Sequence, residues 1–110
     1  MEKVEFIKTE LSEETLKALS IYDVSSSYSL MDEIRQQQLK CEENCIKQVI
    51  EQYTGKPLTI EDAPNVQRAF YMYDYSKYIL AHNGLQLGMI RYINDGCNFT
   101  VEFTPNEVIF

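Results

Sequence analysis

The stretch SLMDEIRQQQLKCEENCIKQVIEQYTGKP, residues 29–57, decides the fold. Apolar side chains recur in it every three or four residues, which is typical of an amphipathic helix with one buried side. Ser29 and Asp32 have the spacing of a capping box, and Gly55 and Pro57 are a stop signal. We therefore expect one long helix from about residue 29 to about residue 54 as the spine of the domain. Its buried side would hold Leu30, Ile34, Cys41, Cys45, Ile46, Val49, Ile50 and Tyr53, and its solvated side Arg35, Gln36, Lys40, Glu43, Lys47 and Glu51.

Before the long helix, the sequence predicts a short strand and a first helix. Residues 4–9 alternate between apolar and polar side chains, which indicates a short N-terminal strand. Ser12 can cap a helix that follows, and Glu13 and Glu14 favour the positive end of its dipole. We expect this first helix over residues 11–20.

After residue 65 the apolar period changes to that of strands. Asn83-Gly84 is a strong hairpin signal because both residues tolerate positive φ, and Asn94-Asp95-Gly96 is a second one. Tyr75-Ser76 has no turn chemistry, so the first two segments could instead form one long bent strand. Helices followed by an antiparallel meander of three to four strands predict an α+β fold with the long helix across the sheet. The expected strands are residues 67–75, 77–82, 85–93 and 98–103.

The composition indicates one acidic globular domain over residues 1–110. Hydrophobic residues make up 45% of the chain and charged residues 25%, which suffices for a core. Seventeen acidic and ten basic residues give a net charge of -7, which argues against binding to nucleic acid or to an anionic membrane. No segment has the roughly 20 apolar residues of a membrane span, and the first residues do not resemble a signal peptide. A cytoplasmic protein is expected.

Three cysteines and the single histidine are the candidate metal ligands. Cys41, Cys45, Cys97 and His82 could together form a zinc site with three sulfur ligands and one nitrogen ligand. Cys41 and Cys45, however, lie in register with the apolar side of the long helix, and their spacing is a poor match to structural zinc sites. Buried cysteines behave as small hydrophobic residues. We therefore assign the cysteines to the core and expect no metal and no cofactor.

The sequence offers no catalytic constellation. A cysteine nucleophile would need His82 as its base and an electropositive setting that lowers the pKa of the thiol. Cys41 has two acidic neighbours, and Cys97 follows an acidic turn. Adjacent acidic pairs such as Glu13-Glu14 do not face one another on a helix. A non-enzymatic protein is expected.

Tyrosines are the most distinctive residues of the chain, with eight of them and no tryptophan. Alternation along 67–75 places Tyr71, Tyr73 and Tyr75 on one face of a strand, and Phe70 on the other. If Phe70 meets the long helix, the tyrosines point to solvent and form an aromatic surface of the kind enriched at protein interfaces. The alternatives are tyrosines packed across strands with solvated hydroxyls, and tyrosines that face the core.

The negative charge is concentrated at the two ends of the chain. Residues 1–33 carry a net charge of -5 and residues 92–110 carry -3, whereas residues 34–91 carry +1. The two acidic ends would share one face if the first strand joined the sheet beside the last. Such a surface attracts a basic partner, although negative charge also serves solubility alone. The candidate steering charges are Glu10, Glu13, Glu14 and Asp23.

Together these observations predict a small acidic binding module that acts through a protein–protein surface, with Tyr71, Tyr73 and Tyr75 as anchors. Its more specific form is an inhibitor or immunity-type protein that blocks a basic partner. The alternative is a small-ligand sensor or accessory domain with a pocket between the long helix and the sheet. A homodimer is compatible with either, because an exposed sheet edge or aromatic face can bind a second copy.

Overall fold

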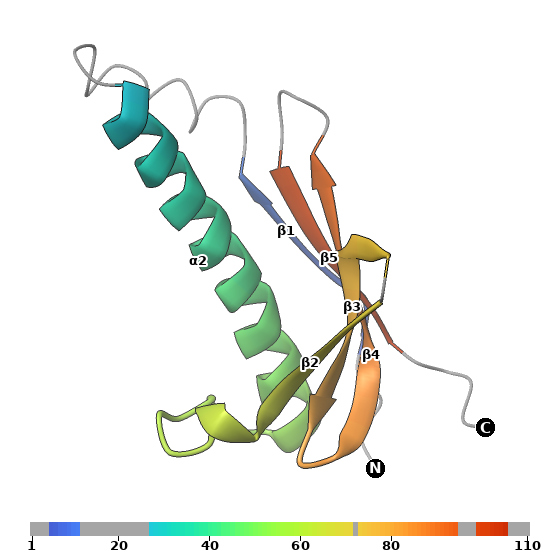
Figure 1. Ribbon diagram of the computed structural model, residues 1–110. Helices are drawn as coiled ribbons and strands as arrows, with labels where there is room; N and C mark the ends of the chain where they lie inside the picture. Colours follow the sequence, from blue (N-terminus) through green and yellow to red (C-terminus); the bar gives the residue numbers. More distant parts are fainter. Residues whose placement is uncertain (1–4, 12–26, 72, 95–98, 106–110) are drawn as a thin grey trace.

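The protein is an α+β domain in which a long helix lies against an antiparallel sheet (Figure 1). The computed structural model describes residues 5–11, 27–71, 73–94 and 99–105. Within these ranges the sheet has five strands in the order β1-β5-β4-β3-β2. The elements are β1 (Ile7–Leu11), α2 (Ser27–Thr54), the short 3-10 helix η1 (Ala63–Asn65), β2 (Val66–Tyr71), β3 (Asp74–His82), β4 (Leu85–Asn94) and β5 (Phe99–Pro105).

The helix α2 confirms the long helix of the sequence analysis. The side chains of Cys41, Cys45, Val49 and Ile50 are buried, whereas the positions of the expected solvated side are exposed. At its end Gly55 adopts a φ of 75°, and its amide donates a hydrogen bond of 2.8 Å to the carbonyl oxygen of Glu51. Glycine takes this left-handed conformation without the steric cost that a Cβ brings. No helix in the described ranges has the length and apolarity needed to cross a membrane.

The first strand departs from the sequence-based expectation in its position along the chain. It spans Ile7–Leu11 instead of residues 4–9, and Leu11 ends the strand as a buried residue opposite Phe99. The alternation continues to Leu11, which lies on the same buried face as Ile7. Leu11 therefore belongs to the strand and not to the expected helix. The expected helix over residues 11–20 otherwise falls on residues that lie outside the described ranges.

The sheet is larger than the expected meander of three to four strands, because β1 joins it at the far edge. β1 pairs antiparallel with β5, with Ile7 opposite Phe103. The first and last strands are therefore neighbours, although most of the chain separates them in sequence. The helix packs mainly against this pair, β1 and β5.

The core lies between α2 and the face of the sheet that it covers. Val101 and Phe103 of β5 are buried, and Phe99 is partly buried, as their alternation predicts. Ile90 of β4 lies opposite Phe103 and is also fully buried. This face completes the apolar cluster that begins on the helix.

One of the two expected turns lies in the described residues, and it is formed where the sequence indicates it. Asn83 and Gly84 join β3 to β4 with φ angles of 52° and 81°, which confirms that hairpin. Asn94 pairs with Phe99 across β4 and β5, and the expected turn between them falls on residues 95–98, outside the described ranges. The single bent strand is wrong: β2 and β3 are separate antiparallel strands, and β2 already ends at Tyr71.

Gly88 of β4 provides a test of the packing between β4 and β5. A Cβ at this position would lie 2.7 Å from Cζ of the buried Phe103 and would collide with the carbonyl oxygen of Thr104. We expect Gly88→Ala to lower the free energy of unfolding by about 1–3 kcal/mol, the usual cost of overpacking. Urea denaturation measures this value, with Gln86→Ala on the exposed part of β4 as the control, expected within about 0.5 kcal/mol of wild type. Equal stability of the two variants would contradict the close approach.

Candidate functional site

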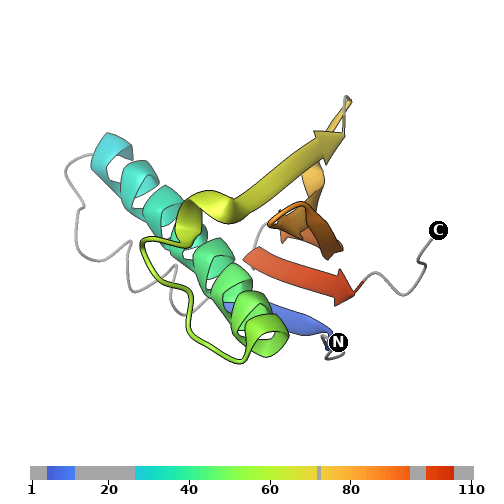
Figure 2. The same ribbon diagram turned by 90° about the horizontal axis from the view of Figure 1, so that it is seen from below.

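The two most exposed aromatic side chains of the described residues, Tyr73 and Tyr75, lie at the end of the β2–β3 hairpin. Together with the nearby Phe70 they form what we call the hairpin tip (Phe70, Tyr73 and Tyr75). Tyr73 is 92% exposed, Tyr75 is 75% exposed and Phe70 is 43% exposed. Figure 2 shows that this end of the hairpin lies away from α2. The tip therefore presents aromatic area to solvent beyond the body of the domain.

The tip is built differently from the predicted row of tyrosines. Because β2 ends at Tyr71, Tyr73 lies in the turn and Tyr75 near the start of β3. The register jumps between the pair Phe70–Tyr78 and the pair Tyr71–Asp74, so β3 carries extra residues here. The side chain of Tyr71 lies outside the described part of the chain. The exposure of Tyr73 and Tyr75 thus comes from a turn and an irregular pairing, and not from one strand face.

Phe70 does not bury itself under the helix as the alternation argument supposed. Its ring instead packs on that of Tyr78, with centroids 4.8 Å apart. The guanidinium carbon of Arg68 lies 5.9 Å from the centre of the Phe70 ring and 5.8 Å from that of Tyr78. A cation over aromatic faces is attracted by their negative quadrupole. One side of Phe70 is thereby held, and the other remains open to solvent.

Behind the hairpin tip lies a polar group built around a buried carboxylate, the Glu42 cluster (Glu42, Arg68, Tyr78 and Tyr92). Glu42 is only 6% exposed, and its Oε2 accepts hydrogen bonds from the hydroxyls of Tyr78, at 2.6 Å, and of Tyr92. Nη1 of Arg68 lies 3.4 Å from the same oxygen. Burial, followed by the bond to the carboxylate, raises the pKa of both tyrosines, so they remain donors. The cluster connects α2 to β2, β3 and β4 in one place.

Sequence reasoning missed Glu42, although a signal was present. Glu42 follows the buried Cys41 and lies four positions before Ile46, on the flank of the apolar stripe. Residues four apart on a helix share a face, so a carboxyl group here faces the sheet. A charged side chain in that position needs hydrogen-bond partners, and the many tyrosines of the chain are candidate hydroxyl donors.

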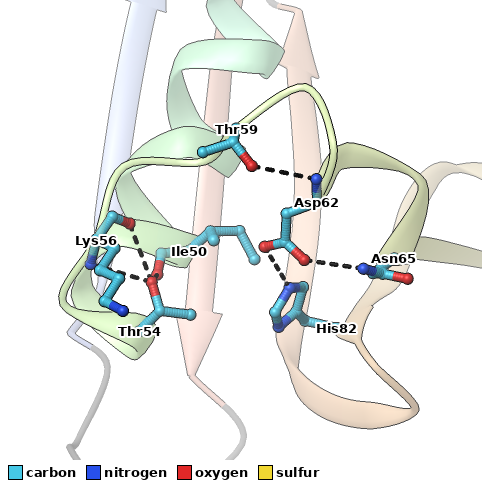
Figure 3. Close-up of polar contacts among 7 residues, drawn as sticks. All are labelled: Ile50, Thr54, Lys56, Thr59, Asp62, Asn65 and His82. Atoms are coloured by element: carbon cyan, nitrogen blue, oxygen red, sulfur yellow. Dashed lines mark hydrogen bonds and ion pairs between the residues drawn. The ribbon is translucent and has the colours of Figure 1, made fainter.

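A second polar group fastens the loop between α2 and β2 to the end of β3 (Figure 3). Nε2 of the buried His82 lies 2.9 Å from Oδ2 of Asp62, and Nδ2 of Asn65 donates to Oδ1 of Asp62 at 2.9 Å. The amide of Asp62 donates to Oγ1 of Thr59 at 3.2 Å. The hydrogen bonds from Asn65 and His82 hold the pKa of Asp62 below its ordinary value. Since an ionised carboxylate only accepts, the imidazole donates in this contact.

The cysteines of α2 occupy the core, as expected. The Sγ of Cys41 donates to Oγ1 of Thr9 at 3.3 Å, and Cys45 is fully buried. Burial raises the pKa of the Cys45 thiol to about 12, which keeps it protonated and unreactive near neutral pH. Cys97 lies outside the described residues, and His82 is engaged with Asp62. No group of three or more potential metal ligands occurs among the side chains that the structure describes.

Of the candidate steering charges, the structure describes only Glu10. This side chain is exposed on β1 and forms an ion pair of 2.8 Å with Lys8. Glu13, Glu14 and Asp23 lie outside the described residues. β1 and β5 are neighbours in the sheet, which is the arrangement that would let the acidic ends of the chain share a face.

Comparison with known proteins gives no further guide to the site, since no family model, no curated protein and no solved structure matches the chain.

The Glu42 cluster predicts that removing either of two adjacent carboxylates, Glu42 or Glu43, changes the free energy of unfolding by very different amounts. Glu42→Ala leaves the buried Tyr78 hydroxyl and the nearby Arg68 without their acceptor, and we expect it to lower the free energy of unfolding by about 3 kcal/mol. Glu43→Ala removes only an exposed ion pair with Lys47 and should cost no more than about 0.5 kcal/mol. Urea denaturation of both variants measures the difference. Equal losses of stability in the two variants would contradict a special contribution of the Glu42 cluster to stability.

The contacts of Asp62 predict an acid-sensitive contribution to stability. Its pKa in the folded protein lies below the ordinary value of 3.8, so its stabilising effect is present above that pH and is lost as pH falls through the folded pKa. The stability difference between wild type and Asp62→Asn should therefore shrink between about pH 5 and about pH 2.5. Chemical denaturation at both pH values measures it, with Glu61→Gln as the control. A difference independent of pH contradicts the assignment.

Proposed function

We propose that the chain is a small, acidic, non-enzymatic binding module that acts through a protein–protein surface at the hairpin tip. The observation that carries the proposal is the near-complete exposure of Tyr73 together with that of Tyr75. These two large aromatic side chains, one in the turn and one two residues later at the start of β3, leave apolar area in water. Tyrosine combines such area with a polar hydroxyl and few rotatable bonds, and it is enriched at binding hot spots.

The hairpin holds this surface in a defined position, which lowers the cost of binding. The carboxylate of Asp74 accepts hydrogen bonds from the amide and the hydroxyl of Ser76, at 2.9 and 2.5 Å. These bonds hold the pKa of Asp74 below its ordinary value and fix the backbone around Tyr75. On the other strand, Phe70 rests on the buried Tyr78. A surface already ordered in the free protein loses less entropy when a partner binds.

The net charge of -7 favours a basic partner, because opposite charge accelerates encounter between proteins. The more specific form of the proposal is an inhibitor or immunity-type protein that covers a basic partner. Glu10, Glu13, Glu14 and Asp23 would steer the approach, and Tyr71, Tyr73 and Tyr75 would anchor the complex. In this scheme the long-range attraction between the acidic chain and the basic partner sets the association rate, and the contacts of the hairpin tip set the dissociation rate.

The alternative is a small-ligand sensor with a pocket between α2 and the sheet, and it has less support. Along the described residues this space is occupied by packed core side chains, such as Val49 and Phe103, and by the Glu42 cluster. We therefore rank it second.

The proposal is tested by replacing the tyrosines singly. The wild-type chain captures its partner from a lysate of its own source, mass spectrometry identifies the partner, and calorimetry measures the affinity of the purified pair. We expect Tyr73→Ser, Tyr75→Ser or Tyr71→Ser to weaken binding by more than about ten-fold at one position at least.

The matched control is Ile60→Ser, because Ile60 is 90% exposed but lies in the loop before η1. Its affinity should stay within about two-fold of wild type. Unchanged affinity in all three tyrosine variants refutes the hairpin tip as the binding surface. A partner with a strongly acidic surface refutes the electrostatic part of the proposal.

A further inference from the structure

The two edges of the sheet differ in how well they are covered. At one edge, β1 lies against α2, and the hydroxyl of Thr9 donates to the carbonyl oxygen of Cys41 at 2.9 Å. At the other edge, β2 pairs with β3 alone within the described part of the chain. Residues 67–70 of β2 are exposed. An open edge presents unpaired backbone N–H and C=O groups, which are a template for another strand.

β2 has few of the features with which proteins block an open edge. Such edges usually carry lysine, proline or a bulge. β2 has the sequence VQRAFY, and the irregularity in its pairing adds residues to β3 and leaves β2 regular. Its one charged residue, Arg68, lies 3.4 Å from the buried carboxylate of Glu42. The charge on this edge is therefore balanced within the chain.

The same charge balance indicates which partner fits the edge. The chain as a whole carries -7, so two copies repel one another over most approaches. β2 has no acidic residue, so contact at this edge brings no carboxylates of the strand together. A basic partner would gain nothing from docking against Arg68. A second copy is thus the occupant that this edge suits best.

The register of such a pairing follows from two-fold symmetry. Opposite residues of paired strands share one face of the sheet, so the symmetry axis passes through a residue that faces its own copy. An axis at Arg68 would oppose two like charges, which is unfavourable. An axis at Ala69 places Arg68 opposite Phe70 of the second copy. Arg68 already lies over Phe70 within its own chain, so the pair is chemically compatible.

We propose that β2 pairs antiparallel with β2 of a second copy, with Ala69 at the two-fold axis, to give a homodimer with one continuous sheet. Phe70 then becomes part of the contact, whereas Tyr73 and Tyr75 of the two copies lie beyond it, in opposite directions. Each dimer presents two copies of Tyr73 and Tyr75, so it can bind two partner molecules or one repetitive partner with increased avidity. The dimer goes beyond the proposed function and does not depend on it.

The test is the mass of the full chain in solution. Sedimentation velocity over about 1 to 100 µM should show wild type approaching twice the chain mass of 12.9 kDa, in the affinity range of transient interfaces. Ala69→Lys places two ammonium groups against one another at the axis, and it should weaken dimerisation by more than about ten-fold. Thr104→Lys adds the same charge at an exposed position of β5 and should remain as dimeric as wild type.

A second measurement keeps the test decisive if Ala69→Lys perturbs folding. Hydrogen exchange on wild type should show the amides of residues 67–71 becoming more protected as the concentration rises through the dimerisation range. A wild-type chain that stays monomeric at the highest concentration overturns the proposal, as does equal dimerisation of the two lysine variants. Tyr73→Ser and Tyr75→Ser should leave the dimer intact, so failure of the partner-binding proposal is distinguishable from failure of this one.

Discussion

The arrangement of the helix on the sheet depends on one buried carboxylate. Glu42 is held inside the domain by two tyrosine hydroxyls and the guanidinium of Arg68, which come from three different strands. Apolar packing along α2 is not directional, and on its own it permits small rotations and shifts of a helix over a sheet. Hydrogen bonds to a single oxygen are directional, and a buried carboxylate without them is strongly disfavoured. The cluster therefore selects one position of α2 relative to β2, β3 and β4.

The position of the hairpin tip depends on this cluster. Tyr78 donates to Glu42 with its hydroxyl and supports Phe70 with its ring, so one side chain links the helix to the exposed aromatic surface. Arg68 performs the corresponding role on β2, since it lies near Glu42 and over both rings. The polar loop around Asp62 and His82 fixes the other end of the same hairpin. Both ends of β2 are thus attached to the body of the domain.

Local chemistry predicts the elements of this fold well, and tertiary pairing explains what it does not predict. The period of α2, the stop at Gly55 and the turn at Asn83-Gly84 each follow from a few neighbouring residues. The end of β2 at Tyr71 and the irregular pairing around Tyr75 depend on how two strands fit together, which the alternation of one strand does not contain. Glu42 was missed for the same reason, because its partners are 26, 36 and 50 residues away in sequence.

The pairing of β1 with β5 has a consequence for how the chain assembles. During synthesis the N-terminal strand emerges first, yet its partner in the sheet is the last strand of the described chain. Contacts between residues so distant in sequence close a large loop and form late, which slows folding. Until β5 is available, the strand β1 and the apolar side of α2 that packs on it remain uncovered, and nascent chains at this stage are exposed to aggregation. Completion of this sheet therefore waits until β5 has been synthesised and has reached β1.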